Sequence, residues 1–217
     1  MKQFFKEAKE EIIETLYAKN AIKWNLTDKF QLKGGILSPM FCNAGILENT
    51  IETRGTVSSA LIFWLGYHFK DVDAVVGMAS GGISWATSLA NCKCLPLLRA
   101  HAIPKNHGLL NQFDGELPFD GAKVIVIDDI ITSGKSVLNV VNALREGVEG
   151  KKAEVVAVFS IFDWNFAATN HRFENAGVKK FHIISFDEVL QYGFENSLLP
   201  EGAAEEIQEF REEQNSL

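Results

Sequence analysis

The sequence is poor in cysteine and has no long apolar run, and these absences exclude several classes of protein. Its three cysteines, Cys42, Cys92 and Cys94, have no disulfide-framework spacing, which is typical of a reducing compartment. Cys92 and Cys94 resemble half of a metal site, but no second pair completes it. No apolar stretch approaches the length of a membrane span, and the first residues lack the apolar core of a signal peptide. We therefore expect a cytoplasmic protein with no membrane contact.

Positive charge is also scarce, because 21 lysines and arginines stand against 28 acidic residues, for a net charge of −7. This balance argues against a broad nucleic-acid-binding surface. Any phosphate-binding site would therefore be local and built from a few cations and backbone donors. The 217 residues, 47% of them hydrophobic, suffice for one sizeable α/β domain. We therefore predict a single domain over residues 1–217 and no nucleic-acid partner.

Short apolar runs alternate with amphipathic segments along most of the chain, which predicts a parallel sheet with helices on both faces. Helices are expected at residues 4–18, 50–69, 83–90 and 166–175, with an acidic, solvated helix at 203–213. Strands are expected at residues 21–24, 30–32, 36–42, 74–77, 95–98, 123–127, 155–162 and 181–185. Residues 100–120 show no periodicity and are expected to form a long functional loop. Ligands of such sheets bind beyond the carboxyl ends of the strands.

Residues 124–136 read Val-Ile-Val-Ile-Asp-Asp-Ile-Ile-Thr-Ser-Gly-Lys-Ser and form the most informative segment. The four β-branched residues predict a strand buried on both faces, with Asp128 and Asp129 following at its carboxyl end. Apolar residues recur at helical spacing from Val137 to Leu144, and Gly147 fits a helix end. A turn of small residues before a helix can direct backbone N–H groups at a phosphate, while carboxylates accept hydrogen bonds from ribose hydroxyls. The segment therefore predicts a site for a phosphorylated sugar.

Two other interpretations of this segment compete with the sugar-phosphate site. Gly134, Lys135 and Ser136 match the end of the nucleotide P-loop, but the first glycine of that motif would fall at position 129, where Asp129 stands. The second alternative is an ordinary strand–helix unit with a polar turn. Two adjacent acids followed by small or hydrogen-bonding turn residues favour the sugar-phosphate site over it.

The segment resembles the phosphoribosyl-diphosphate-binding motif of type I phosphoribosyltransferases, and two further motifs narrow the family. Residues 30–35, Phe-Gln-Leu-Lys-Gly-Gly, and residues 38–45, Ser-Pro-Met-Phe-Cys-Asn-Ala-Gly, are similar to the N-terminal signature of orotate phosphoribosyltransferases. Residues 105–108, Lys-Asn-His-Gly, are similar to the catalytic loop Lys-Asp-His-Gly of that family. The motifs occur in matching order over roughly residues 20 to 190.

The resemblance implies a type I phosphoribosyltransferase fold, with a central mostly parallel sheet, helices on both faces and a small N-terminal hood. Residues 1–48 would form the N-terminal helix and base-pocket hood, 49–190 the sheet core with a mobile loop at 100–120, and 191–217 the C-terminal helix. It implies magnesium-dependent transfer of the 5-phosphoribosyl group from phosphoribosyl diphosphate to orotate, giving orotidine 5′-monophosphate and pyrophosphate in pyrimidine (UMP) biosynthesis. Mg²⁺ would be carried by the diphosphate without direct protein ligands. The family acts as a homodimer in which each loop reaches into the neighbouring site.

The same motifs imply a role for each matching residue. Catalytic roles fall to Lys105, His107 and Asp129. The phosphoribosyl diphosphate site would comprise Lys33, Ser80, Gly81, Arg99, Lys105, His107, Asp128, Asp129, Ile130, Ile131, Thr132, Ser133, Gly134, Lys135 and Ser136. The base pocket would comprise Phe41, Cys42, Thr132 and Trp164. In this scheme the cations neutralise the leaving pyrophosphate, and the closing loop excludes water.

Two departures from the family pattern concern the diphosphate. Ser80 and Gly81 stand where the family often has Tyr-Lys. Ala100 follows Arg99 where the family usually has a lysine, and two extra residues precede Lys105. Each departure removes one cation from the expected site.

Two further departures concern the base. The family places an arginine after the strand that ends near Ser160, where it pairs with the carboxylate of orotate, but here Trp164 follows and the next arginine is Arg172. Cys42 replaces the second phenylalanine of the base pocket. Two alternatives therefore stay open: transfer to another base, which the missing arginine favours, and a regulator that binds phosphoribosyl diphosphate without turnover, which the missing loop cations favour.

Overall fold

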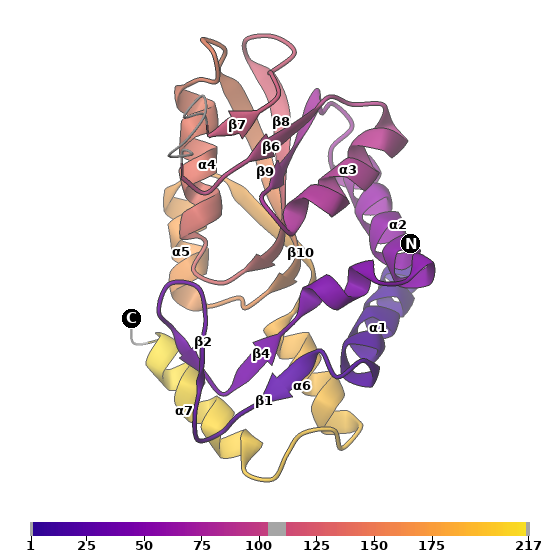
Figure 1. The fold of residues 1–217 in the computed structure, drawn as a ribbon, viewed down its shortest axis with the longest axis vertical. Coiled ribbons are helices and arrows are strands. Elements are labelled where there is room, and N and C mark those ends of the chain that lie inside the picture. Colours follow the sequence, from indigo (N-terminus) through magenta and orange to yellow (C-terminus); the bar gives the residue numbers. More distant parts are fainter. Residues whose placement is uncertain (1, 104–111, 216–217) are drawn as a thin grey trace.

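The chain folds into three layers, in which a six-stranded sheet lies between two layers of helices (Figure 1). The computed structural model describes residues 2–103 and 112–215. The sheet has the strand order β10-β9-β8-β5-β6-β7, and neighbouring strands are parallel except β7, which is antiparallel to β6. Its strands are β5 (Ala74–Met78), β6 (Leu97–Ala100), β7 (Phe113–Asp114), β8 (Ala122–Ile131), β9 (Ala153–Asp163) and β10 (Lys179–Ser185). The mostly parallel sheet with helices on both faces confirms the predicted fold class.

The two faces of the sheet carry separate apolar cores, which explains the run of β-branched residues in β8. Val124 and Val126 pack beneath α4 (Lys135–Glu146) and Phe173 of α5 (Ala167–Asn175). Ile125 and Ile127 belong to the opposite core, with α1 (Lys2–Ala18), α2 (Ile51–His68) and α3 (Gly82–Lys93). Because alternate side chains of a strand point to opposite faces, a strand covered on both sides needs apolar residues at every position.

β8 is longer than the sequence pattern indicates. The prediction ended this strand at Ile127, but its pairing with β9 continues to the Ile131–Asp163 pair. Asp128 and Asp129 therefore lie within the carboxyl-terminal end of the strand rather than after it. The apolar residues that follow, Ile130 and Ile131, let the strand continue past two acids that would end most buried strands.

The stretch 100–120 also contains structure that the sequence pattern did not indicate. Phe113 and Asp114 form β7, which pairs with Arg99 and Ala100 at the edge of the sheet. A strand of two residues is too short to give a periodic pattern, so its pairing with β6 is a tertiary effect. The prediction of an unstructured segment was wrong at this point.

The N-terminal residues build a small hood at one end of the molecule (Figure 1). The hood consists of residues 22–42, in which β1 (Ile22–Trp24) pairs antiparallel with β4 (Met40–Cys42), and β2 (Phe30–Gln31) with β3 (Leu37–Ser38). A 3₁₀ helix (Ala44–Glu48) connects it to α2, whose first turn is capped by the Thr50 side chain. A Cβ added to Gly34 would lie 3.3 Å from Oγ of Ser133, so the hood touches the turn after β8.

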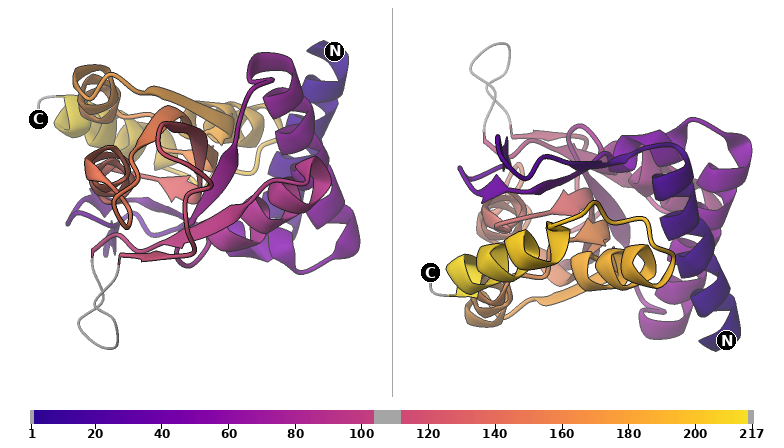
Figure 2. Two further views of the ribbon diagram at one scale, coloured as in Figure 1. Left: turned by 90° about the horizontal axis from the view of Figure 1, so that it is seen from above. Right: turned by 90° about the horizontal axis from the view of Figure 1, so that it is seen from below.

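The C-terminal region differs most from the sequence prediction. Helix α6 (Phe186–Glu195) was not expected, although Ser185 and Glu188 form a capping box at its start, a signal present in the sequence. Helix α7 (Ala203–Asn215) was expected to be solvated, but Ile207 and Phe210 are buried in the apolar core. The two views of Figure 2 show α6 and α7 lying along one side of the molecule. In the described part of the chain, no helix combines the length and apolar character needed to cross a membrane.

Candidate functional site

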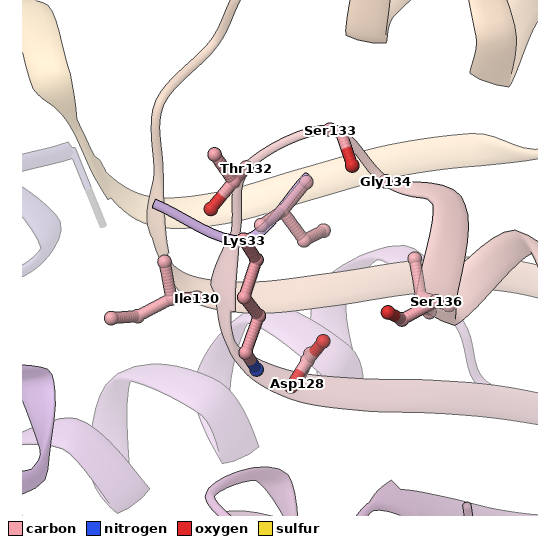
Figure 3. A pocket seen from close by; sticks show the side chains of 9 residues that line it. Lys33, Asp128, Ile130, Thr132, Ser133, Gly134 and Ser136 are labelled. Atoms are coloured by element: carbon pink, nitrogen blue, oxygen red, sulfur yellow. The ribbon is translucent and has the colours of Figure 1, made fainter. Parts of the chain in front are cut away.

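The turn of residues 132–136 joins the end of β8 to the first turn of α4 and lines a small pocket. Gly134 has a φ of 72°, a left-handed conformation that favours glycine, and an added Cβ would lie 2.6 Å from the Phe173 ring. The turn pocket is lined by Lys33, Asp128, Ile130, Ile131, Thr132, Ser133, Gly134, Ser136 and Val137 (Figure 3). Backbone N–H groups at a helix start attract an anion, so the pocket suits a phosphate group.

Asp128 and Asp129 place two carboxylates beside this turn. The side chain of Asp128 accepts a hydrogen bond of 2.9 Å from the Asp129 N–H, and the residue is only 8% exposed. Burial raises the pKa of Asp128 to about 8, and the charge of Asp129 acts in the same direction, while Lys33 lowers it. Figure 3 shows the Lys33 side chain crossing the pocket with its amine beside Asp128. The buried carboxylate therefore has too few partners, which hydroxyl donors or a cation would supply.

The raised pKa of Asp128 makes the stability of the free protein depend on pH. A carboxyl whose folded-state pKa exceeds its ordinary value of 3.8 contributes stability below about pH 4, and this contribution is lost as the pH rises through about 8. The asparagine side chain of Asp128→Asn does not ionise, so this variant does not lose stability in this way. We therefore expect the variant to melt several degrees higher than the wild type at pH 9, with the difference shrinking towards pH 5.

Thermal unfolding followed by circular dichroism between pH 5 and pH 9 checks this expectation. Asp71→Asn, which changes an exposed carboxylate outside both pockets, is the matched control and should follow the wild type. Parallel curves for Asp128→Asn and the wild type would contradict the assignment of a raised pKa to Asp128.

A second pocket opens between the hood and the carboxyl ends of the sheet strands. This hood pocket is lined by Gln31, Leu32, Lys33, Phe41, Cys42, Asn43, Ala44, Gly45, Ser80, Gly81, Asp129, Ile130, Thr132 and Trp164. It shares Lys33, Ile130 and Thr132 with the turn pocket. The two pockets therefore form one continuous site, with carboxylates where they meet.

The walls of the hood pocket have distinct chemistry. Phe41 is 39% exposed and packs against Phe30, with 5.8 Å between ring centroids, so part of its ring is available to a ligand. Burial, followed by the charge of Asp129, raises the pKa of the Cys42 thiol to about 12, so it stays a neutral thiol. Trp164 is only 3% exposed because its ring packs against Phe166 and Phe186. Trp164 therefore serves as a rigid wall rather than as an open stacking face.

Two glycines after β5 allow that strand and β8 to approach closely at the site. A Cβ on Gly81 would lie 2.1 Å from Oδ2 of Asp129, and a Cβ on Gly82 would lie 2.3 Å from the Ile127 carbonyl oxygen. Both distances are far below van der Waals contact, so position 82, which faces backbone atoms, requires glycine, and a side chain at position 81 would displace the Asp129 carboxylate. Gly81 thereby sets the position of the Asp129 carboxylate in the hood pocket.

Some residues predicted for the site are not among those that line either pocket. Arg99 lies 3.8 Å from Asp114 in an ion pair, and Lys135 is the first residue of α4. Arg172, the nearest arginine after β9 in the sequence, donates a hydrogen bond of 3.1 Å to the Ser133 carbonyl oxygen instead of entering the hood pocket. Lys105 and His107 lie outside the described residues.

Other lining residues had no predicted role. Asn43, Ala44 and Gly45 belong to the N-terminal signature and line the hood pocket, so the motif itself contained the signal that could have assigned them. Gln31 and Leu32 line it from the same hood. The side chains of Thr169 and Arg172, on α5, donate hydrogen bonds to carbonyl groups of the turn. The local sequence contained no signal for these bonds, because each joins residues nearly 40 positions apart.

Comparison with known families identifies the family to which the chain belongs. The model of the phosphoribosyl transferase domain matches residues 57–174, which include β8, the two carboxylates and the 132–136 turn. The chain belongs to this family. The matched segment contains every lining residue of the turn pocket except Lys33, and the hood, which supplies Lys33 and part of the second pocket, precedes it.

Relatives of this phosphoribosyl transferase extend the match into the hood. The orotate phosphoribosyltransferase of Cytophaga hutchinsonii is 25% identical over 93% of the chain and 94% of that protein. The orotate phosphoribosyltransferase of Bacillus anthracis is 28% identical over 94% of each. The solved structure of Leishmania donovani UMP synthase is similar in fold, with a TM-score of 0.76 and 18% identity. That match covers 94% of the present chain but only 42% of the UMP synthase chain.

Proposed function

We propose that this phosphoribosyltransferase transfers the 5-phosphoribosyl group of phosphoribosyl diphosphate to orotate, forming orotidine 5′-monophosphate and pyrophosphate. The observation that carries the proposal is the continuity of the two pockets, which share Lys33, Ile130 and Thr132. A phosphorylated ribose in the turn pocket would place its anomeric carbon towards a base in the hood pocket. The relatives that match almost the whole chain are orotate phosphoribosyltransferases, which supports orotate as the base.

The residues of the turn pocket would bind and orient the sugar. Backbone N–H groups of the 132–136 turn would donate to the 5′-phosphate, and the carboxylates of Asp128 and Asp129 would accept from the ribose hydroxyls. Such hydrogen bonds, together with Lys33, would lower the raised pKa of Asp128 and keep it ionised. Both carboxylates would also stabilise positive charge that develops on the ribose ring as pyrophosphate departs.

Magnesium, dimerisation and location stay predictions of the sequence. The adjacent carboxylates of Asp128 and Asp129 fit the neighbourhood of a cation, and we propose that Mg²⁺ is carried by the diphosphate. Bound Mg²⁺ would neutralise part of the charge on the leaving group. We also propose a homodimer in which the segment containing Lys105 and His107 completes the neighbouring site, and a cytoplasmic location.

A turnover assay tests the proposed reaction. Purified protein is incubated with Mg²⁺, phosphoribosyl diphosphate and orotate, and the loss of orotate absorbance is followed. The proposal predicts consumption that requires all three components. Binding of phosphoribosyl diphosphate without loss of orotate would overturn it.

A second base is the rival candidate, and one feature of the hood pocket favours it. Among the residues that line this pocket, Lys33 is the only cationic side chain, and it also faces the Asp128 carboxylate. Trp164 stands where the family places an arginine for the carboxylate of orotate. A panel of uracil, adenine, guanine and hypoxanthine under the same conditions distinguishes the candidates, because turnover of one of these without turnover of orotate would establish the rival.

Replacing Gly81 with alanine should impair the sugar site with little effect on folding. The added Cβ would occupy the position of the Asp129 carboxylate, which must rotate away. We expect the KM for phosphoribosyl diphosphate to rise by at least about tenfold, the equivalent of one lost charged hydrogen bond. Gly55→Ala is the matched control, because nothing lies within 4 Å of its added Cβ. Unchanged kinetics in Gly81→Ala would refute the role of Asp129 in the sugar site.

A further inference from the structure

Helix α5 packs against the 132–136 turn and contributes no residue to the lining of the turn pocket. The Cβ that Gly134 lacks would lie 2.6 Å from the ring of Phe173 and 3.3 Å from Cγ2 of Thr169, both on α5. Thr169 and Phe173 are almost fully buried. The turn pocket is lined by residues of the hood, β8, the turn and α4, and by none from α5. Figure 1 shows α5 beside α4 on the same face of the sheet.

Two side chains of α5 donate hydrogen bonds to successive carbonyl groups of the turn. Oγ1 of Thr169 donates to the Thr132 carbonyl oxygen at 2.7 Å, and Nη1 of Arg172 donates to the Ser133 carbonyl oxygen at 3.1 Å. The first bond is buried, and the second is formed by a charged donor, a type that is stronger than a neutral bond. Both carbonyl groups therefore point towards α5.

This orientation determines where the neighbouring N–H groups point. The peptide bonds of the turn are trans, and the C=O and N–H of a trans peptide point in opposite directions. The carbonyl of Thr132 shares its peptide plane with the N–H of Ser133, and the carbonyl of Ser133 shares its plane with the N–H of Gly134. Because the carbonyls face α5, both N–H groups point away from α5, and Ser133 and Gly134 both line the turn pocket.

A buried ion pair between Asp163 and Lys180 helps to anchor the start of α5. Asp163, at the end of β9, is fully buried and accepts a hydrogen bond of 2.7 Å from the Asn165 N–H. The side chain of Asn170, on α5, donates to the side-chain oxygen of Asn165 at 3.1 Å. Burial alone would raise the pKa of Asp163, but His182 and Lys180 outweigh it and hold the pKa below its ordinary value. The ionised carboxylate thus ties the start of the helix to the sheet.

We propose that Thr169 and Arg172 are positioning residues that hold two peptide planes of the turn so that the N–H groups of Ser133 and Gly134 face the 5′-phosphate of the substrate. This role rests on the proposed function and adds to it a source of preorganisation outside the pocket. A turn rich in small residues has many accessible conformations, and fixing two of its peptide planes before binding lowers the entropic cost of holding the phosphate.

Matched substitutions separate the hydrogen bonds from the packing. Thr169→Val removes the hydroxyl donor and keeps the volume, while Thr169→Ser keeps the donor. Arg172→Met removes the guanidinium and keeps most of the stem, and Arg172 is only partly buried, so this variant should fold even if Thr169→Val does not. The probes are ribose 5-phosphate, which needs the turn, and pyrophosphate, which does not. Their dissociation constants are measured by isothermal titration calorimetry on the full chain.

We expect Thr169→Val and Arg172→Met each to weaken ribose 5-phosphate binding by roughly 5- to 10-fold, the effect of one hydrogen bond, with pyrophosphate affinity unchanged. Thr169→Ser should stay within roughly twofold of the wild type. In turnover, the KM for phosphoribosyl diphosphate should rise more than kcat falls.

Folded variants with unchanged ribose 5-phosphate affinity would overturn the positioning role. Equal losses for ribose 5-phosphate and pyrophosphate would also overturn it, because they would indicate a general structural effect. Failure of the wild type to bind either probe would instead refute the proposed function, and with it this inference. If the wild type turns over orotate and the variants behave as the wild type does, the positioning role is refuted and the proposed function is not.

Discussion

Replacing both Asp128 and Asp129 with asparagine should abolish measurable binding of phosphoribosyl diphosphate, and the variant should remain folded. The two side chains stand where the turn pocket meets the hood pocket, and they are the carboxylates that line these pockets. A hydrogen bond to a charged group contributes about 1.5–3 kcal/mol, so loss of the charge on two such acceptors should weaken binding by at least about 100-fold. The backbone donors of the 132–136 turn are unchanged in this variant, so any residual affinity should come from the 5′-phosphate.

The same substitutions should not impair folding, which separates this prediction from a general structural effect. Asp128 is buried with a raised pKa, so its charge opposes the folded state of the free protein above neutral pH. The double variant should therefore melt at the same temperature as the wild type or higher at pH 8. Isothermal titration calorimetry with phosphoribosyl diphosphate and Mg²⁺ measures binding, and Asp71→Asn is the matched control. Wild-type affinity in the double variant would show that these carboxylates do not bind the ribose.

Lys105→Ala should lower kcat by about 100- to 1,000-fold, which is the typical effect of removing one group that stabilises developing charge. Lys105 lies outside the described residues, and its proposed role rests on the similarity of residues 105–108 to the catalytic loop of orotate phosphoribosyltransferases. Two features of the chain increase the expected importance of Lys105. Ser80 and Gly81 supply no cation where the family often has lysine, and Arg99 is paired with Asp114.

Steady-state kinetics and a binding measurement together test the role of Lys105. If the lysine acts on the leaving pyrophosphate in the transition state, kcat should fall much more than the affinity for phosphoribosyl diphosphate. Lys70→Ala removes an exposed lysine outside both pockets and should leave both quantities unchanged. Full activity in Lys105→Ala would show that the motif match is misleading and that another cation faces the pyrophosphate.

The sequence was most predictive where local pattern and tertiary environment agree. The run of β-branched residues before Asp128 is typical of a strand covered on both faces, and the structure has such a strand. Gly147 ends α4, as the sequence predicts. Thr50 caps α2 at the position where the pattern began. Each of these signals depends on a few neighbouring residues, so no knowledge of distant contacts is needed.

The features that sequence reasoning missed depend on distant partners or on a weak local signal. Arg172 could not be assigned from sequence, because its hydrogen bond to Ser133 joins two separate strand–helix units. The apolar face of α7 is diluted by glutamates, so the burial of Phe210 against Phe186 was not apparent. The capping box of Ser185 and Glu188 did mark α6, and this signal was overlooked.

Formation of orotidine 5′-monophosphate by the wild type but not by a site variant would link the proposed reaction to the described site. Wild-type protein and the Asp128→Asn, Asp129→Asn double variant are incubated with Mg²⁺, phosphoribosyl diphosphate and orotate, and the products are identified by mass spectrometry. We expect equal amounts of orotidine 5′-monophosphate and pyrophosphate from the wild type and none above background from the variant. Absence of the nucleotide from the wild-type reaction, or its formation at the same rate by the variant, would contradict this expectation.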